Sequence, residues 1–189
     1  SNIGGGALQI TGGNLVITNS TIGGSSAPGA YTDRTSTNTG NLQAGSGGGV
    51  TYTPSSPQHT GGTGTFTTTG STFSRNTASG IGGGGADFLI FAFAAPGGIG
   101  SGSASIGTST FSNNQALGTA NGGGFIIESL GTTVATTSFT TNSSGNRGGG
   151  IMVAGARLLL NGTTPSITFT GNTATNGGSS VSTSAAVNV

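Results

Sequence analysis

The chain has 189 residues, of which 41 are glycine, four are Lys or Arg, three are Asp or Glu and one is His. The resulting formal net charge of +1 excludes the basic surface that nucleic acid or an anionic membrane would require. The absence of cysteine excludes disulfides and thiolate metal sites. No stretch approaches the roughly 20 apolar residues of a spanning helix, so we expect neither nucleic-acid binding nor membrane insertion.

Enrichment in glycine and serine is also found in disordered linkers, which bury too little apolar surface to offset the entropy of the chain. Two features argue against that interpretation here. Phenylalanine and β-branched residues recur at matched places along the chain, and 31% of the residues are hydrophobic. We therefore expect a single folded domain over residues 1–189.

The first part of the chain contains two predicted β units with long insertions. Glycines 4–6 precede the apolar runs "ALQI" and "NLVIT", and glycines 47–49 precede "VTYT" and "TGTFTT". Residues 23–46 and 54–64 contain many Ser, Thr and Gly residues, which is typical of loops. These two ranges are predicted to be loop insertions.

The rest of the chain repeats a Phe-x-x-Asn motif four times, with the phenylalanines 28 to 38 residues apart. After each motif come a short polar stretch, a glycine cluster and an apolar run such as "FIIESL" or "IMVAG". The four pairs are Phe73/Asn76, Phe111/Asn114, Phe139/Asn142 and Phe169/Asn172.

Short strands and turns repeated at this period, without helical periodicity, predict an all-β parallel β-helix, or β-solenoid, of about six coils. Stacking of the coils would place the phenylalanines in one interior column. The asparagines are expected at a corner, where this residue type tolerates a left-handed backbone and can bond to its own turn and to the asparagine of the next coil. Glycine clusters suit turns of positive φ and places where coils approach closely.

The Phe-x-x-Asn pairs, together with the glycine clusters before Ala86, Phe125 and Ile151, resemble the repeats of polymorphic outer membrane proteins and related β-helical adhesins of bacterial surfaces. The similarity covers roughly residues 71–180. It implies a right-handed, single-stranded parallel β-helix at a cell surface, often with an adhesive role. The chain departs from those proteins because it lacks cysteine and carries scarcely any charge.

Catalysis has little support in the sequence. A β-helical polysaccharide lyase or hydrolase needs paired carboxylates, or a carboxylate-bound cation with a base. The available carboxylates are Asp33, which adjoins Arg34, and Asp87 and Glu128, which follow glycine clusters at different offsets. The one imidazole, His59, lies in a proline-containing loop and has no partners for a metal site. We expect no enzyme activity, no cofactor and no metal.

Two further surface features depend on Asn and Thr. The glycosylation sequence Asn-x-Ser/Thr occurs at Asn19, Asn142 and Asn161, and the ladder role expected for Asn142 leaves Asn19 and Asn161 as candidate acceptors. Threonine-rich stretches such as "TGTFTTTGSTF" suggest an ice-binding array, which requires a threonine grid over several coils. The sequence indicates such a grid in one coil only, so ice binding is not expected.

The segment "ADFLIFAFAAP" is apolar at both its even and its odd positions. Together with the equivalent strands of later coils, it predicts an outer apolar stripe for self-association. Its candidate members are Phe88, Phe91, Phe93, Phe125 and Ile151. The alternative is that one of the insertions, 23–46 or 54–64, covers this stripe.

These features predict a non-catalytic extracellular or cell-surface protein that associates with copies of itself into a filament or surface layer. The two ends of the chain read as partial units, which favours end-to-end stacking through unpaired strand edges. The alternative is an adhesin segment that binds glycan or a host cell-surface protein through polar loops, residues 23–46 above all.

Overall fold

The computed structural model describes residues 8–11, 13–23, 31–32, 48–53, 64–79, 86–88, 102–127, 131–154, 157–162, 166–183 and 187–188. These residues contain 22 β-strands and no helix. All pairs of neighbouring strands are parallel, and they form four sheets, named A to D here in the order in which the chain visits them.

Sheets A and B each contain six strands. Sheet A consists of β1 (Leu8–Thr11), β5 (Val50–Thr53), β9 (Ala86–Phe88), β13 (Phe125–Ile127), β17 (Ile151–Val153) and β21 (Val181–Thr183). Sheet B consists of β2 (Leu15–Thr18), β6 (Gly64–Thr69), β10 (Gly102–Gly107), β14 (Gly131–Ala135), β18 (Leu158–Asn161) and β22 (Val187–Asn188).

Sheets C and D each contain five strands. Sheet C consists of β3 (Thr21–Gly23), β7 (Thr72–Ser74), β11 (Thr110–Ser112), β15 (Ser138–Thr140) and β19 (Thr168–Thr170). Sheet D consists of β4 (Tyr31–Thr32), β8 (Thr77–Ser79), β12 (Gln115–Leu117), β16 (Ser143–Ser144) and β20 (Thr173–Ala174).

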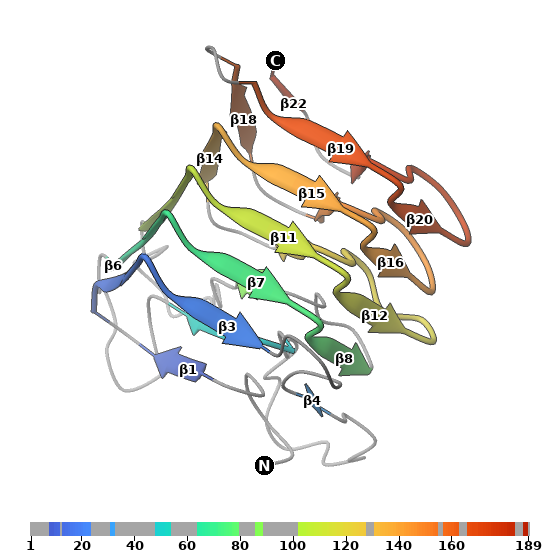
Figure 1. Ribbon diagram of the computed structural model, residues 1–189, viewed down its shortest axis with the longest axis horizontal. Coiled ribbons are helices and arrows are strands. Elements are labelled where there is room, and N and C mark those ends of the chain that lie inside the picture. The colour runs from blue at the N-terminus through green and yellow to red at the C-terminus, as the bar shows by residue number, and fades with distance from the viewer. Residues whose placement is uncertain are drawn as a thin grey trace, which may run out of the picture.

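The strands form a stack of coils in which each turn of the chain passes through sheets A, B, C and D in that order. Figure 1 shows the strands of sheet C stacked on the near side, from β3 (blue) to β19 (red). The chain runs along them from left to right, returns behind them and rises by one coil, which makes the coil right-handed. The predicted right-handed parallel β-solenoid of six coils, the last incomplete, is therefore confirmed.

Alternation of side chains along the strands builds the core. In β6 the residues alternate between buried and more exposed positions, and the central residue of β7, β11 and β15 is a fully buried phenylalanine. Because successive side chains of a strand point to opposite faces, one apolar residue in two is enough to fill the interior. The largest fully buried side chains are Tyr52, Phe66, Phe73, Phe111, Phe125 and Phe139.

The structure changes the bounds of the two predicted insertions. Gly23 is the last residue of β3, Tyr31 and Thr32 form β4, and Gly64 is the first residue of β6. The strand β4 pairs with β8 in register, so part of the first insertion belongs to sheet D. The remaining residues of both predicted loops lie outside the described part of the chain.

Candidate functional site

The four phenylalanines of the repeated motif form one interior column. Strand register pairs Phe73 with Phe111, Phe111 with Phe139 and Phe139 with Phe169. The ring centroids lie 4.6, 5.2 and 4.9 Å apart, with interplanar angles of 3°, 12° and 10°. Phe125, from sheet A, packs edge-on against Phe111 and Phe139. Full burial of a phenylalanine ring, as for Phe73, Phe111 and Phe139, stabilises the fold by about 1.5–3 kcal/mol.

The four asparagines form a hydrogen-bonded ladder at the corner between sheets C and D. The backbone N and Nδ2 of Asn114 both donate to Oδ1 of Asn142, each at 3.0 Å. The Nδ2 group of Asn142 also donates to the backbone carbonyl of Phe111 at 2.9 Å. The same arrangement joins Asn76 to Asn114 and Asn142 to Asn172. Oδ1 of Asn76 is buried without a described hydrogen-bond partner, because it lies at the beginning of the described ladder.

The expectation that asparagine itself takes the left-handed conformation is wrong. The positive φ lies on the preceding residue, with values of 55°, 56°, 54° and 63° at Arg75, Asn113, Thr141 and Gly171. This one-residue offset lets the turn residue point outward while the asparagine turns inward. The asparagine amide is then free to bridge two coils.

A second polar ladder, at the corner between sheets B and C, was missed by the sequence analysis. Its hydroxyls bond to the carbonyl two residues earlier, at 3.0 Å for Ser71, 2.8 Å for Ser109 and 2.7 Å for Thr137. Each of these residues also follows a left-handed residue, as does Ser20. The available signal was the hydroxyl residue just before each Thr-Phe or Ser-Phe pair in "GSTF", "TSTF" and "TTSF".

The glycine clusters lie at the corner between sheets D and A. Gly122 has a φ of +67°, which an L side chain rarely adopts. A Cβ atom on Gly123 would collide with the backbone carbonyl oxygens of Gly149 and Ser143. The clusters therefore combine a left-handed turn with close approach of successive coils.

The predicted outer apolar stripe is contradicted at its two described side chains. Phe125 and Ile151 are fully buried members of the interior core, because their strands begin with an inward-facing residue. The outward positions are Ile126 and Met152, which are only 1% and 5% exposed, so other parts of this chain cover them. Phe88 occupies the register position of the core residue Ile127, and Phe91 and Phe93 lie outside the described residues.

The chemically reactive residues are not brought together in the described part of the chain. Asp87 lies in β9, in register with Thr51 and Ile126. Asp33, Arg34, His59 and Glu128 lie outside the described residues. Among those that are described, no group of three or more His, Cys, Asp or Glu residues could hold a metal ion.

One ionisable side chain is deeply buried. The hydroxyl of Tyr52 donates to the backbone carbonyl of Gly13 at 2.6 Å, and the residue has no exposed surface. Desolvation by burial raises the pKa of this tyrosine above its usual value of 10.0. The ring of Tyr52 packs against that of Phe66 in the second coil, and its hydroxyl bonds to Gly13 in the first coil. The residue therefore has a structural role in joining these two coils.

The three Asn-x-Ser/Thr sequences differ in accessibility. Asn142 is fully buried in the asparagine ladder, so its amide is inaccessible to a glycosyltransferase. Asn19 is exposed at a turn with a φ of 46°, and Asn161 is exposed at the end of β18. The two candidate acceptors, Asn19 and Asn161, therefore remain accessible.

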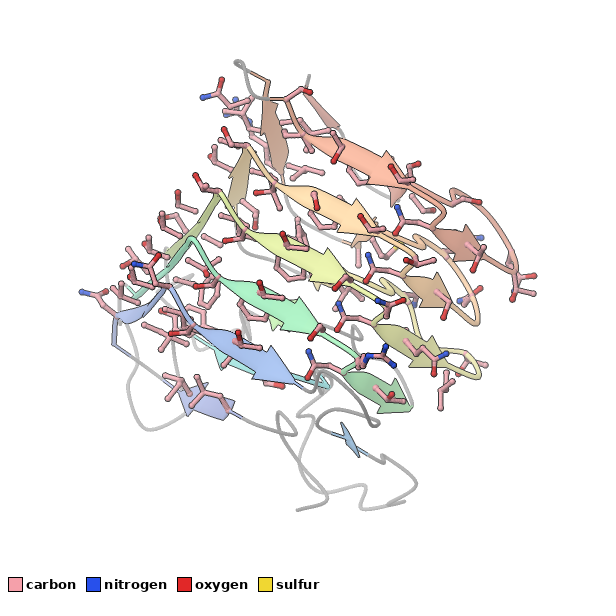
Figure 2. All side chains as sticks on the ribbon, viewed as in Figure 1. Atoms are coloured by element: carbon pink, nitrogen blue, oxygen red, sulfur yellow. The ribbon has the colours of Figure 1, made fainter. Side chains whose placement is uncertain are left out.

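The outer face of sheet C carries two columns of hydroxyl residues that extend over five coils, whereas a threonine grid was expected in one coil only. Each strand presents its first and third residues outward, on either side of an inward Phe or Ile. Figure 2 shows short oxygen-tipped side chains along this face. In register order the first column is Thr21, Thr72, Thr110, Ser138 and Thr168, and the second is Gly23, Ser74, Ser112, Thr140 and Thr170.

The apolar core is open at both ends of the described stack. The hydrophobic residues that pack against the buried core but remain partly exposed all lie in the first coil or the last two. At the N-terminal end they are Leu8, Ile10, Leu15 and Ile22, and at the C-terminal end they are Leu160, Ile167, Phe169 and Val181. Both ends therefore present incompletely covered apolar surface beside strand edges.

In the described part of the chain, no helix is long and apolar enough to cross a membrane. No family model matches the sequence, and neither a curated protein nor a solved structure was found to match it.

Proposed function

We propose that this protein is a non-catalytic, extracellular structural solenoid that associates with copies of itself end to end. The observation that carries the proposal is the distribution of partly exposed core residues, which in the described part of the chain lie in the first coil and in the last two. Apolar surface at two ends of one stack favours a heterologous contact, and heterologous contacts that do not close produce filaments.

Strand register gives this contact a specific form. Leu8 and Val181 occupy the same column of sheet A, in the first and the last coil. Parallel pairing of β21 with β1 of the next copy would continue sheet A and place Val181 beside Leu8. Each such junction would satisfy unpaired strand edges and remove apolar surface from water.

Composition supports a structural rather than a catalytic role. Seven charged residues in 189 leave little electrostatic repulsion between copies and few groups for acid–base chemistry. The resemblance to repeats of bacterial surface proteins supports an extracellular location.

The proposal is tested with two end variants of the full chain, Leu8→Asp and Val181→Asp, and with Leu117→Asp as the matched control. Leu117 is 40% exposed on sheet D in the third coil, so its replacement leaves both ends unchanged. A buried carboxylate at a junction is costly. We expect the wild type and Leu117→Asp to form chains in sedimentation velocity, while each end variant stays monomeric.

Mixing the two end variants makes the test specific for head-to-tail contact. Leu8→Asp retains an intact C-terminal end and Val181→Asp retains an intact N-terminal end, so their mixture should yield heterodimers and nothing longer. Circular dichroism of each variant establishes that the solenoid is folded. A monomeric wild type, or a mixture that remains monomeric while the wild type forms chains, contradicts the proposal.

A further inference from the structure

The outer face of sheet C is a regular array of hydroxyl groups. Nine of its ten outward positions are Thr or Ser, and the tenth is Gly23. Neighbouring strands lie about 4.8 Å apart, and alternate residues of one strand lie about 6.6 Å apart. The two columns therefore form a two-dimensional grid whose repeats are set by the β-sheet itself.

Eight of the nine hydroxyl groups of this grid, all but that of Ser74, are available to an external partner. Apart from Ser74, none of the nine side chains makes a hydrogen bond within the structure as far as the chain is described. Hydroxyls of the neighbouring corner behave differently, since those of Ser109 and Thr137 are each held by a backbone carbonyl. At these eight positions the outer face of sheet C thus presents donors and acceptors that the described part of the chain does not use.

The grid is also held rigidly. The inward residue between each pair of hydroxyls from β7 to β19 is a stacked phenylalanine. In β7, β11 and β15 the asparagine ladder fixes one end of the strand, and the serine and threonine ladder fixes the other. Threonine adds to this order because its branched Cβ restricts χ1. Binding to a rigid array loses little conformational entropy.

The chemistry of the face points to one occupant. All outward residues of the sheet are uncharged, so a charged ligand finds no counter-charge there. Sugar rings are usually bound by stacking on exposed aromatic side chains, but the aromatic residues of sheet C face the interior. A neutral, periodic, hydroxyl-bearing surface is chemically complementary to the surface of a neutral, periodic lattice of water molecules.

We propose that the outer face of sheet C binds ice. The hydroxyls of the two columns would hydrogen-bond to lattice waters, and the threonine methyl groups would lie between them. This function goes beyond end-to-end association and is independent of it, because the grid lies on the side of the solenoid whereas the open core lies at its ends. Stacked copies would repeat the ice-binding face along the filament.

The proposal is tested on the full chain with Thr110→Lys, at the centre of the first column, and with Ser105→Lys as the matched control. Ser105 faces outward from β10, in the same coil, but on sheet B. A lysine side chain within the grid would hold its own hydration shell and keep the lattice away. Thermal hysteresis, and partition of labelled protein into a growing ice hemisphere, report the binding.

We expect the wild type and Ser105→Lys to enter the ice and to show thermal hysteresis, while Thr110→Lys loses most of both activities. A second variant, Thr140→Lys, should behave like Thr110→Lys, because it lies in the second column of the same face. Exclusion of the wild type from ice, with hysteresis no greater than that of serum albumin, overturns the proposal. Equal activity of wild type, Thr110→Lys and Thr140→Lys overturns it as well.

The end variants Leu8→Asp and Val181→Asp leave sheet C unchanged, so they should bind ice as the wild type does even when they no longer associate. Measuring their ice binding therefore distinguishes failure of this proposal from failure of end-to-end association.

Discussion

The amide of Asn114 donates to Oδ1 of Asn142 at 3.0 Å, so two residues 28 positions apart in sequence are joined in the buried corner of successive coils. Oδ1 of Asn142 also accepts the backbone N–H of Asn114. One side-chain oxygen therefore accepts hydrogen bonds from both the side-chain amide and the backbone N–H of the asparagine one coil earlier. The Nδ2 group of Asn142 in turn donates to the carbonyl of Phe111 and to Oδ1 of Asn172, so the corner uses the combined acceptor and donor capacity of an amide.

Replacement of a ladder asparagine should be strongly destabilising. In Asn142→Ala, the backbone N–H of Asn114 and the carbonyl of Phe111 lose their buried partner, and each unsatisfied group costs about 1–3 kcal/mol. We expect a loss of several kcal/mol of unfolding free energy in urea denaturation. The control is Asn176→Ala, whose side chain bonds to Asn146 on the surface and should contribute little. Equal effects of the two substitutions would contradict this role of the ladder.

The phenylalanine column predicts a position-dependent cost of truncation. Phe111 stacks on a ring above and a ring below and is fully buried, so Phe111→Ala should cost about 3–5 kcal/mol. Phe169 stacks on Phe139 alone among the described rings and remains partly exposed, so Phe169→Ala should cost less. Thermal or urea unfolding of the two variants checks the order, and a reversed order would contradict the column.

Close approach of the coils at the glycine corner can be tested by adding a single methyl group. Gly123→Ala forces a Cβ atom onto the backbone of Gly149 and Ser143, and we expect it to cost about 1–3 kcal/mol or to prevent folding. Gly131→Ala is the control, because a Cβ there meets no atom within 4 Å. The control variant should be as stable as the wild type. A folded Gly123→Ala protein of unchanged stability would show that the coils are more widely spaced.

Burial of Tyr52 predicts loss of stability at alkaline pH. Because the pKa of the Tyr52 hydroxyl is raised in the folded state, folding favours the protonated hydroxyl. The resulting contribution to the free energy of unfolding is fully present below pH 10.0, the pKa of the unfolded state. It is lost as the pH rises from that value through the raised folded pKa. Tyr52→Phe should lose the hydrogen bond to Gly13, at a cost of about 1 kcal/mol, and should have a flatter stability profile above pH 10. Unfolding free energies measured between neutral and alkaline pH provide the comparison.

The repeated motif was sufficient to predict the fold. Phe139 and Asn142 recur with their spacing unchanged, and stacking of identical residues follows from any parallel coil. The direction of neighbouring side chains was harder to predict. Phe125 and Ile126 are both apolar, so composition alone could not assign one to the interior and the other to a covered outer position.

The polar features were predicted less completely for a related physical reason. Ser109 and Thr110 are adjacent hydroxyl residues, yet one is bonded to a corner carbonyl and the other belongs to the outer grid. Only the backbone geometry, with a left-handed residue at Thr108, separates their roles. Because both kinds of hydroxyl occur within the same short motif, the sequence alone does not separate the outer grid from the corner ladder.

Electron microscopy of the wild-type protein at increasing concentration tests the central claim most directly. End-to-end stacking predicts unbranched filaments with strands perpendicular to the long axis, and a subunit repeat of roughly 30 Å for six coils about 4.8 Å apart. These filaments should be lost in Val181→Asp and retained in Leu117→Asp. Dispersed single particles at all concentrations, or filaments whose strands run along the axis, would contradict the account.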